Sequence, residues 1–214
     1  MPAKSSARPG PLAMVFGEDD YAVQRRGREV FNAWQEELGG MDHETIDARA
    51  GNSGEALGAV KKLHEALNTL PFFGGGKAIW FKDCSFLGDD RTSASGAVTE
   101  ALAGLADTLK SFTWGNVRLV ITAGKVDKRK SFFKVLQKAG NVEEYAGWSA
   151  SDKDWADRAE MLAREALRER GKRIDEEALA QLVQSVGPHP RQLQMEVEKL
   201  ATYAGDAQAI TSDD

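Results

Sequence analysis

Short continuous apolar runs alternate with amphipathic stretches over the first two thirds of the chain. The apolar runs at residues 12–16, 78–81 and 117–122 are typical of strands that are buried on both faces of a parallel sheet. Two shorter, more polar strands are expected at 43–47 and 142–145. The helical spacing of apolar residues predicts helices over 21–37, 53–70, 98–109 and 131–138. Strands that alternate with helices imply right-handed crossovers, so we expect an α/β fold with flanking helices.

The strand signal disappears after Trp148, and three helical patterns follow. Ser149 or Ser151 is expected to cap the first helix, which runs to about residue 170. Asp175 caps a second helix that extends to Val186, and a third helix is predicted over 191–203. The second part of the chain is therefore predicted to be a small three-helix domain.

The charge distribution changes at the same place. The 214 residues include 28 basic and 33 acidic side chains, a net charge of −5. Residues 1–147 carry 19 of each sign, whereas residues 148–214 carry 9 basic and 14 acidic groups, which accounts for the whole deficit. We therefore predict a flexible leader over 1–10, an α/β domain over 11–147 and a helical lid domain over 148–214.

Composition excludes several classes of protein. Cys84 is the single cysteine, which excludes a disulfide framework and a cysteine-based zinc site, and the three histidines are scattered along the sequence. No apolar run approaches the ~18 residues of a membrane span, and residues 1–10 lack the apolar core of a secretory signal. The net negative charge argues against a basic nucleic-acid coat. We expect a cytoplasmic protein without a metal or a membrane segment.

A sheet domain followed by a helical lid is typical of the AAA+ architecture, in which ATP binds at the junction. A phosphate loop would need G-x-x-x-x-G-K-[S/T] between the first strand and its helix. That turn instead contains Gly17 followed by Glu18, Asp19 and Asp20, whose carboxylates would repel phosphate. We therefore expect no cofactor and no catalytic residue, the alternative being an active ATPase with an unconventional phosphate loop.

Two further segments resemble parts of an ATP site but lack its chemistry. Gly74–Gly76 and Lys77 precede a strand instead of following one, which indicates a tight turn. Asp83 ends a strand, but Cys84 stands where an ATPase would have a second acid to polarise water. Neither segment completes a site for magnesium and nucleotide.

Phe72 and Phe73 follow a predicted helix that ends at Leu70, with Pro71 between them. Proline fixes the local backbone, and the three glycines that follow suggest a mobile exit. The rings either fold inward over the sheet or project into an apolar pocket of a partner, where paired aromatic anchors dominate binding.

A basic run lies at the junction between a predicted strand and the helix that follows it. Its cations are Lys125, Lys128, Arg129 and Lys130. These side chains either contact DNA phosphates or another subunit, or form a solvated loop.

In four segments, taken in order, the chain resembles the delta subunit of the bacterial DNA polymerase III clamp loader. Residues 14–21 (MVFGEDDY) are similar to the opening strand and turn of that family, and residues 70–77 (LPFFGGGK) to its L-P-x-F element. Residues 119–134 (LVITAGKVDKRKSFFK) resemble its strand and K-x-D-K-R-x-K stretch. Residues 190–205 (PRQLQMEVEKLATYAG) resemble its L-R-x-L-x-N-E helix, with Met195 in place of the asparagine.

The resemblance implies an AAA+ fold without ATPase chemistry, in a subunit that binds and opens the ring-shaped sliding clamp. It implies clamp binding through Leu70, Pro71, Phe72 and Phe73. The implied partners are the clamp (beta subunit), the gamma/tau and delta prime subunits, and primed DNA within the complex. ATP hydrolysis and nucleotidyl transfer would belong to other subunits of the holoenzyme. A free-standing clamp-binding or DNA-binding adaptor is the other alternative.

The family typically continues beyond the sequence that matches residues 209–214 into a helical collar domain. We expect the collar domain to be absent from this chain, which is either truncated or naturally short.

Overall fold

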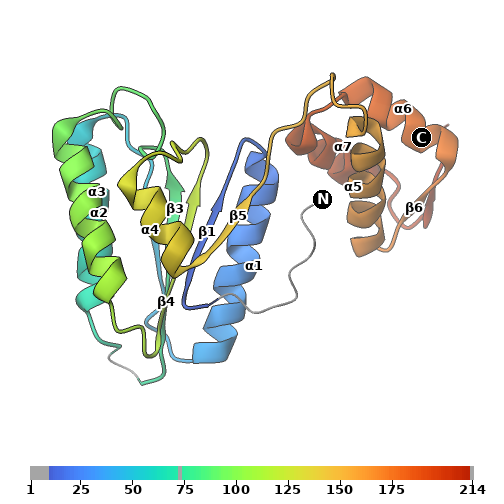
Figure 1. The fold of residues 1–214 in the computed structure, drawn as a ribbon. Helices are drawn as coiled ribbons and strands as arrows, with labels where there is room; N and C mark the ends of the chain where they lie inside the picture. Colours follow the sequence, from blue (N-terminus) through green and yellow to red (C-terminus); the bar gives the residue numbers. More distant parts are fainter. Residues whose placement is uncertain (1–9, 72–73, 213–214) are drawn as a thin grey trace. The chain divides into compact units, whose positions relative to one another are not determined.

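The computed structural model describes residues 10–71 and 74–212, and the chain folds into two compact units (Figure 1). The first unit ends at Tyr145 and the second begins at Ala146. The boundary drawn from charge, between residues 147 and 148, lies two positions later.

The first unit is a parallel sheet with helices on both faces, as the alternation of apolar runs predicts. The strand order is β2-β3-β4-β1-β5, and each neighbouring pair is parallel. The strands are β1 (Leu12–Phe16), β2 (Glu44–Asp47), β3 (Lys77–Cys84), β4 (Val117–Ala123) and β5 (Asn141–Glu144). The helices are α1 (Asp20–Leu38), α2 (Ser53–Asn68), α3 (Gly96–Ser111) and α4 (Ser131–Ala139).

The two faces of the sheet have separate apolar cores, because successive side chains of a strand point to opposite sides. Leu12, Met14 and Phe16 of β1 join a core with buried residues of α2, α3 and α4. Ala13 and Val15 instead pack in the core under α1. Figure 1 shows α1 alone on one face and α2, α3 and α4 on the other. Burial on both faces explains why β1 reads as an unbroken apolar run.

Helix α1 lies unusually close to the sheet at Gly27. A β-carbon at this position would lie 2.4 Å from Cγ2 of Thr122, so only glycine permits this approach. Thr122 is fully buried, and its hydroxyl oxygen accepts hydrogen bonds from Trp80 Nε1 (3.1 Å) and from the backbone N–H of Asp83 (3.0 Å). These contacts hold α1 against the sheet and join β3 to β4.

A half-buried ion pair joins α1 to the edge strand β5. Arg26 donates two hydrogen bonds to Glu143, from Nε to Oε2 (2.8 Å) and from a terminal nitrogen to Oε1 (2.9 Å). The Tyr145 hydroxyl also donates to Oε2 of Glu143 (3.1 Å). Burial opposes ionisation of Glu143, but its hydrogen bonds from Arg26 and Tyr145 outweigh that effect and lower the pKa of its carboxyl.

The second unit is a helical domain, as expected, with a small sheet that the sequence pattern did not indicate. Its helices are α5 (Trp155–Glu169), α6 (Glu176–Val186) and α7 (Pro190–Tyr203). Strands β6 (Arg173–Ile174) and β7 (Ala209–Ile210) pair in parallel. Asp175 caps α6 as predicted, because its carboxylate accepts a hydrogen bond from the Ala178 N–H (2.7 Å).

Helix α5 begins later than the sequence predicts. The Ser149 hydroxyl accepts a hydrogen bond from the Ser151 N–H (3.2 Å), and the carboxylate of Asp152 accepts one from the Ser149 N–H (3.1 Å). These bonds form a turn instead of a helix cap, so the first helical residue is Trp155. In neither unit is a described helix both long enough and apolar enough to cross a membrane.

Candidate functional site

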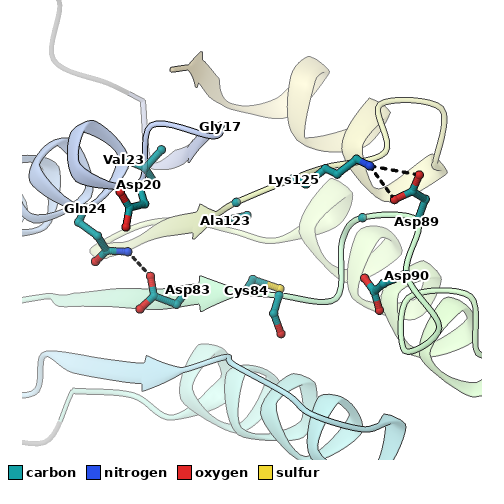
Figure 2. Close-up of a pocket in the computed structure, with 13 residues that line it drawn as sticks. Gly17, Asp20, Val23, Gln24, Asp83, Cys84, Asp89, Asp90, Ala123 and Lys125 are labelled. Carbon is teal, nitrogen blue, oxygen red and sulfur yellow. Dashed lines mark hydrogen bonds and ion pairs between the residues drawn. The ribbon is translucent and has the colours of Figure 1, made fainter. Parts of the chain in front are cut away.

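A pocket of about 360 Å³ lies at the carboxyl ends of the central strands. In open α/β sheets this edge is where ligands bind. Its lining residues include Gly17, which follows β1, and Asp83 at the end of β3. The lining also includes Ala123 at the end of β4 and Lys125 just beyond it (Figure 2). The pocket therefore lies beside the turn between β1 and α1, the turn at which a phosphate loop would be found.

The charge of this pocket is unsuited to phosphate. Four aspartates line it, and among its described lining residues Lys125 is the one cation. Lys125 Nζ pairs with Asp89 Oδ1 at 3.1 Å, as Figure 2 shows. A nucleotide bound here would place its negative charges beside carboxylates, where like charges repel. The lining aspartates are Asp20, Asp83, Asp89 and Asp90.

The turn after β1 is closed by contacts within the chain. The Gly17 N–H is shared between the carbonyl oxygens of Ala123 and Gly124, both at 3.2 Å. Asp19 is 8% exposed, and its carboxylate accepts a hydrogen bond from the Ala22 N–H (2.9 Å), which caps α1. In a phosphate loop the amides at this helix start would face the ligand. Here the negative charge at the helix start comes from Asp19 itself.

Asp83 and Cys84 end β3 without the geometry of a magnesium-and-water pair. Asp83 has a positive φ of 59°, and its carboxylate accepts a hydrogen bond from the Gln24 side chain (Figure 2). Cys84 is fully buried, and burial raises the pKa of its thiol, so the reactive thiolate is disfavoured. Within residues 10–71 and 74–212, no cluster of histidine, cysteine and acidic side chains is arranged to hold a metal ion.

Lys77, the lysine of the glycine-rich segment, lies at the amino end of β3 and not at the pocket. Its side chain is 2% exposed, and its ammonium group pairs with Glu44 Oε1 at 2.6 Å. This lysine therefore bridges β2 and β3 and does not reach the pocket.

We expect millimolar ATP with magnesium to leave the melting temperature of the chain unchanged. The pocket offers carboxylates in place of a phosphate loop, and a ligand at 100 times its dissociation constant would add about 2.7 kcal/mol to the stability. Differential scanning fluorimetry with and without Mg-ATP measures the shift. A rise of several degrees would show that the pocket binds nucleotide and would contradict this assignment.

Two of the four predicted clamp-binding residues, Leu70 and Pro71, are described, and they lie at the opposite end of the sheet, between α2 and β3. Helix α2 ends at Asn68, and Leu70 is 84% exposed, the largest exposed fraction among the described large apolar side chains. Pro71 is half-buried. Phe72 and Phe73 lie outside the described residues.

Two of the three glycines that follow, Gly75 and Gly76, are packed closely against neighbouring backbone. Gly74 and Gly75 have φ values of 76° and 77°, which favour glycine. The Gly76 N–H donates to the Leu38 carbonyl (3.1 Å), and a β-carbon on Gly76 would lie 2.5 Å from the Asn116 carbonyl oxygen. The segment therefore needs glycine for close packing against the loops that follow α1 and α3.

Each cation of the basic run after β4 has a partner within the chain. Lys125 pairs with Asp89, as described above, and Lys128 Nζ lies 2.6 Å from Glu144 Oε2. Arg129 Nε lies 2.9 Å from Asp127 Oδ1, and Lys130 Nζ donates to the carbonyl oxygen of Ser93 (2.9 Å). The Lys125, Lys128 and Arg129 side chains are more than half exposed, so these surface pairs contribute little to stability.

Two residues that form hydrogen bonds with Asp83 of the pocket, Gln24 and Thr122, were not singled out from the sequence. Gln24 lies on a helix whose polar residues look like an ordinary solvent face, so no signal distinguishes it. Thr122 did carry a signal, since it is a polar residue within the apolar run of β4, and it supports β3 through the Asp83 N–H.

The family model described as "DNA polymerase III, delta subunit" matches residues 14–146, which is more than half of the chain. No curated protein matches the sequence significantly. The Bacillus subtilis DNA clamp loader delta protein YqeN is similar in structure, with a TM-score of 0.54 and 20% sequence identity. The match covers 95% of this chain and 56% of that one.

The Thermotoga maritima RuvB Holliday junction branch migration motor is also similar, with a TM-score of 0.53 and 10% identity. That match covers 95% of this chain and 59% of the RuvB chain. Both likenesses show an AAA+-like fold, and this chain spans little more than half the length of either protein.

Proposed function

The chain belongs to the DNA polymerase III delta subunit family, and from that premise we propose that it binds and opens the sliding clamp during DNA replication. It does so without ATPase chemistry of its own. Its partners are the clamp, the gamma/tau and delta prime subunits of the loader, and primed DNA within the complex. ATP hydrolysis and nucleotidyl transfer belong to the other subunits, and the complex acts in the cytoplasm.

The exposure of Leu70 is the observation that carries this proposal. A large apolar side chain that is 84% exposed, just beyond the end of α2, has no role in the core of its own unit. It begins the Leu70–Phe73 segment that resembles the clamp-binding element of the family. Together with the two phenylalanines it offers the large apolar groups that dominate protein contacts when buried in a partner's pocket.

The acidic pocket supports the non-catalytic part of the proposal. Asp19 neutralises the start of α1, and Lys77 is buried against Glu44, so neither group is available to a nucleotide phosphate. A subunit of this kind depends on its neighbours for ATP-driven changes.

We further propose that Lys125, Lys128, Arg129 and Lys130 contact DNA or another loader subunit. The exposed ion pairs of Lys125, Lys128 and Arg129 are weak enough for a phosphate or a partner carboxylate to compete for these cations. Such a contact would weaken with rising salt concentration, since each phosphate contact releases condensed counterions.

Surface plasmon resonance on immobilised sliding clamp of the source organism tests the proposal directly. We expect the 214-residue chain to bind saturably. The readout should not change when Mg-ATP is added. Absence of binding by a folded chain would contradict the proposed function, and hydrolysis of ATP by the purified chain would favour an active ATPase instead.

A further inference from the structure

Two large apolar side chains of the first unit are exposed far beyond the rest of its described residues. Leu70 is 84% exposed and Met41 is 76% exposed, whereas the next, Leu57, reaches 36%. Met41 lies in the loop between α1 and β2, and Leu70 in the loop between α2 and β3. Because β2 and β3 are adjacent and parallel, both loops lie at the amino ends of these strands, the lower end of the sheet in Figure 1.

The two loops are packed together through their glycines. A β-carbon on Gly40 would lie 2.6 Å from the Gly74 carbonyl oxygen, and one on Gly75 would lie 2.9 Å from the Gly39 carbonyl oxygen. The Gly76 N–H donates a hydrogen bond to the Leu38 carbonyl. The backbone before Met41 is therefore in direct contact with the segment that follows Phe73.

The backbone after Met41 is fixed as well. His43 Nδ1 accepts a hydrogen bond from the Ala78 N–H of β3 (3.1 Å), two residues beyond Met41. The backbone is thus fixed on both sides of Met41, while the Met41 side chain remains in solvent. A fixed backbone reduces the entropy that a side chain loses when a partner covers it.

We propose that Met41 is a second apolar anchor for the sliding clamp, at the same end of the sheet as Leu70. This inference rests on the proposed function, since it takes the partner to be the one that receives the Leu70–Phe73 segment. The unbranched thioether of methionine adapts to irregular apolar pockets, which suits the edge of a contact centred on aromatic rings. Large exposed apolar side chains that gather at one end of a sheet are typical of an interaction surface, whereas an isolated exposed residue would need no explanation.

Replacing Met41 with glutamine tests the anchor, because it keeps the side-chain length and removes the apolar contact. We expect clamp affinity to fall about 5- to 30-fold, the range of an anchor beside the central ones. Met161→Gln is the matched control: Met161 is 54% exposed in the second unit and should leave the affinity within about twofold of that of the unsubstituted chain. Met41→Leu, which preserves apolar contact, should bind nearly as well as the unsubstituted chain.

The outcomes separate the two proposals. If the folded, unsubstituted chain does not bind the clamp, the proposed function fails. If that chain binds, and loses binding when Phe72 and Phe73 are replaced, but Met41→Gln binds normally, the clamp proposal stands and the Met41 inference is overturned. Circular dichroism tests whether each variant is folded. If Met41→Gln does not fold, the clamp affinity of Met41→Leu is compared with that of Leu70→Gln instead. Met41→Leu binding no more tightly than Leu70→Gln would overturn the inference.

Discussion

Binding of the chain to the sliding clamp is expected to disappear when Phe72 and Phe73 are both replaced by alanine. Well-buried aromatic anchors each contribute ~2 kcal/mol or more on truncation, which is about 30-fold in affinity for each residue. If the two effects add, the loss approaches three orders of magnitude and exceeds the range of a standard surface plasmon resonance titration. The measurement uses immobilised clamp, with circular dichroism and thermal unfolding as folding controls.

Substitution of Lys128 and Arg129 is the matched control for the phenylalanine pair. Both side chains lie on the surface at the carboxyl end of the sheet, and rim charges change affinity little. If the phenylalanine variant unfolds, the two rings belong to the core and the binding assignment is wrong. If it folds and binds normally, the clamp contacts another surface.

Replacing Gly17 with alanine should destabilise the first unit more than any surface substitution. Gly17 has a φ of 144°, and a β-carbon there would lie 1.9 Å from the backbone oxygen of Tyr145. The Tyr145 backbone in turn bonds to the Phe16 carbonyl (2.8 Å) and accepts from the Asp19 N–H (3.2 Å), so it cannot move without breaking these contacts. Backbone strain and overpacking together should cost about 3–5 kcal/mol, a drop in melting temperature of roughly 10 °C or more.

Gly58→Ala provides a control for the general effect of adding a methyl group. Gly58 lies within α2, and a β-carbon there would have no neighbour within 4 Å. Alanine in an open helix position should stabilise the chain by about 0.5–1 kcal/mol. Urea unfolding followed by circular dichroism compares the two variants. Equal unfolding midpoints for Gly17→Ala and the unsubstituted chain would show that the turn after β1 adjusts freely.

The elements of the sheet could be predicted because their signals are local. An unbroken apolar run such as Leu12–Phe16 reports burial on both faces, and Asp175 before an apolar helical pattern reports a cap. The two-residue strands β6 and β7 are too short for any periodicity, so they left no signal. Ser149 and Ser151 were misread as helix caps, because a serine that stabilises a turn is indistinguishable by type from one that caps a helix.

The parts of the site that could not be predicted depend on contacts between residues that are distant in sequence. A lysine at the start of a strand normally reads as exposed, and only the pairing of β2 with β3 brings Glu44 to Lys77. The composition of residues 74–76 suggests mobility, whereas the close contacts of Gly74 and Gly75 with Gly40 and Gly39 depend on the folded sheet. The lack of a phosphate-loop motif can be predicted from the sequence, because it depends only on the consecutive residues of the acidic turn after Gly17.

The burial of Cys84 gives the chain an internal reporter of unfolding. It is the single cysteine of the sequence, it is fully buried at the end of β3, and the second unit contains no thiol. A thiol-reactive dye added to the native chain would react only when the sheet opens, so the labelling rate follows opening of the first unit alone. Comparison of this rate with the loss of total tryptophan fluorescence, to which tryptophans of both units contribute, would show whether the first unit opens alone or together with the second.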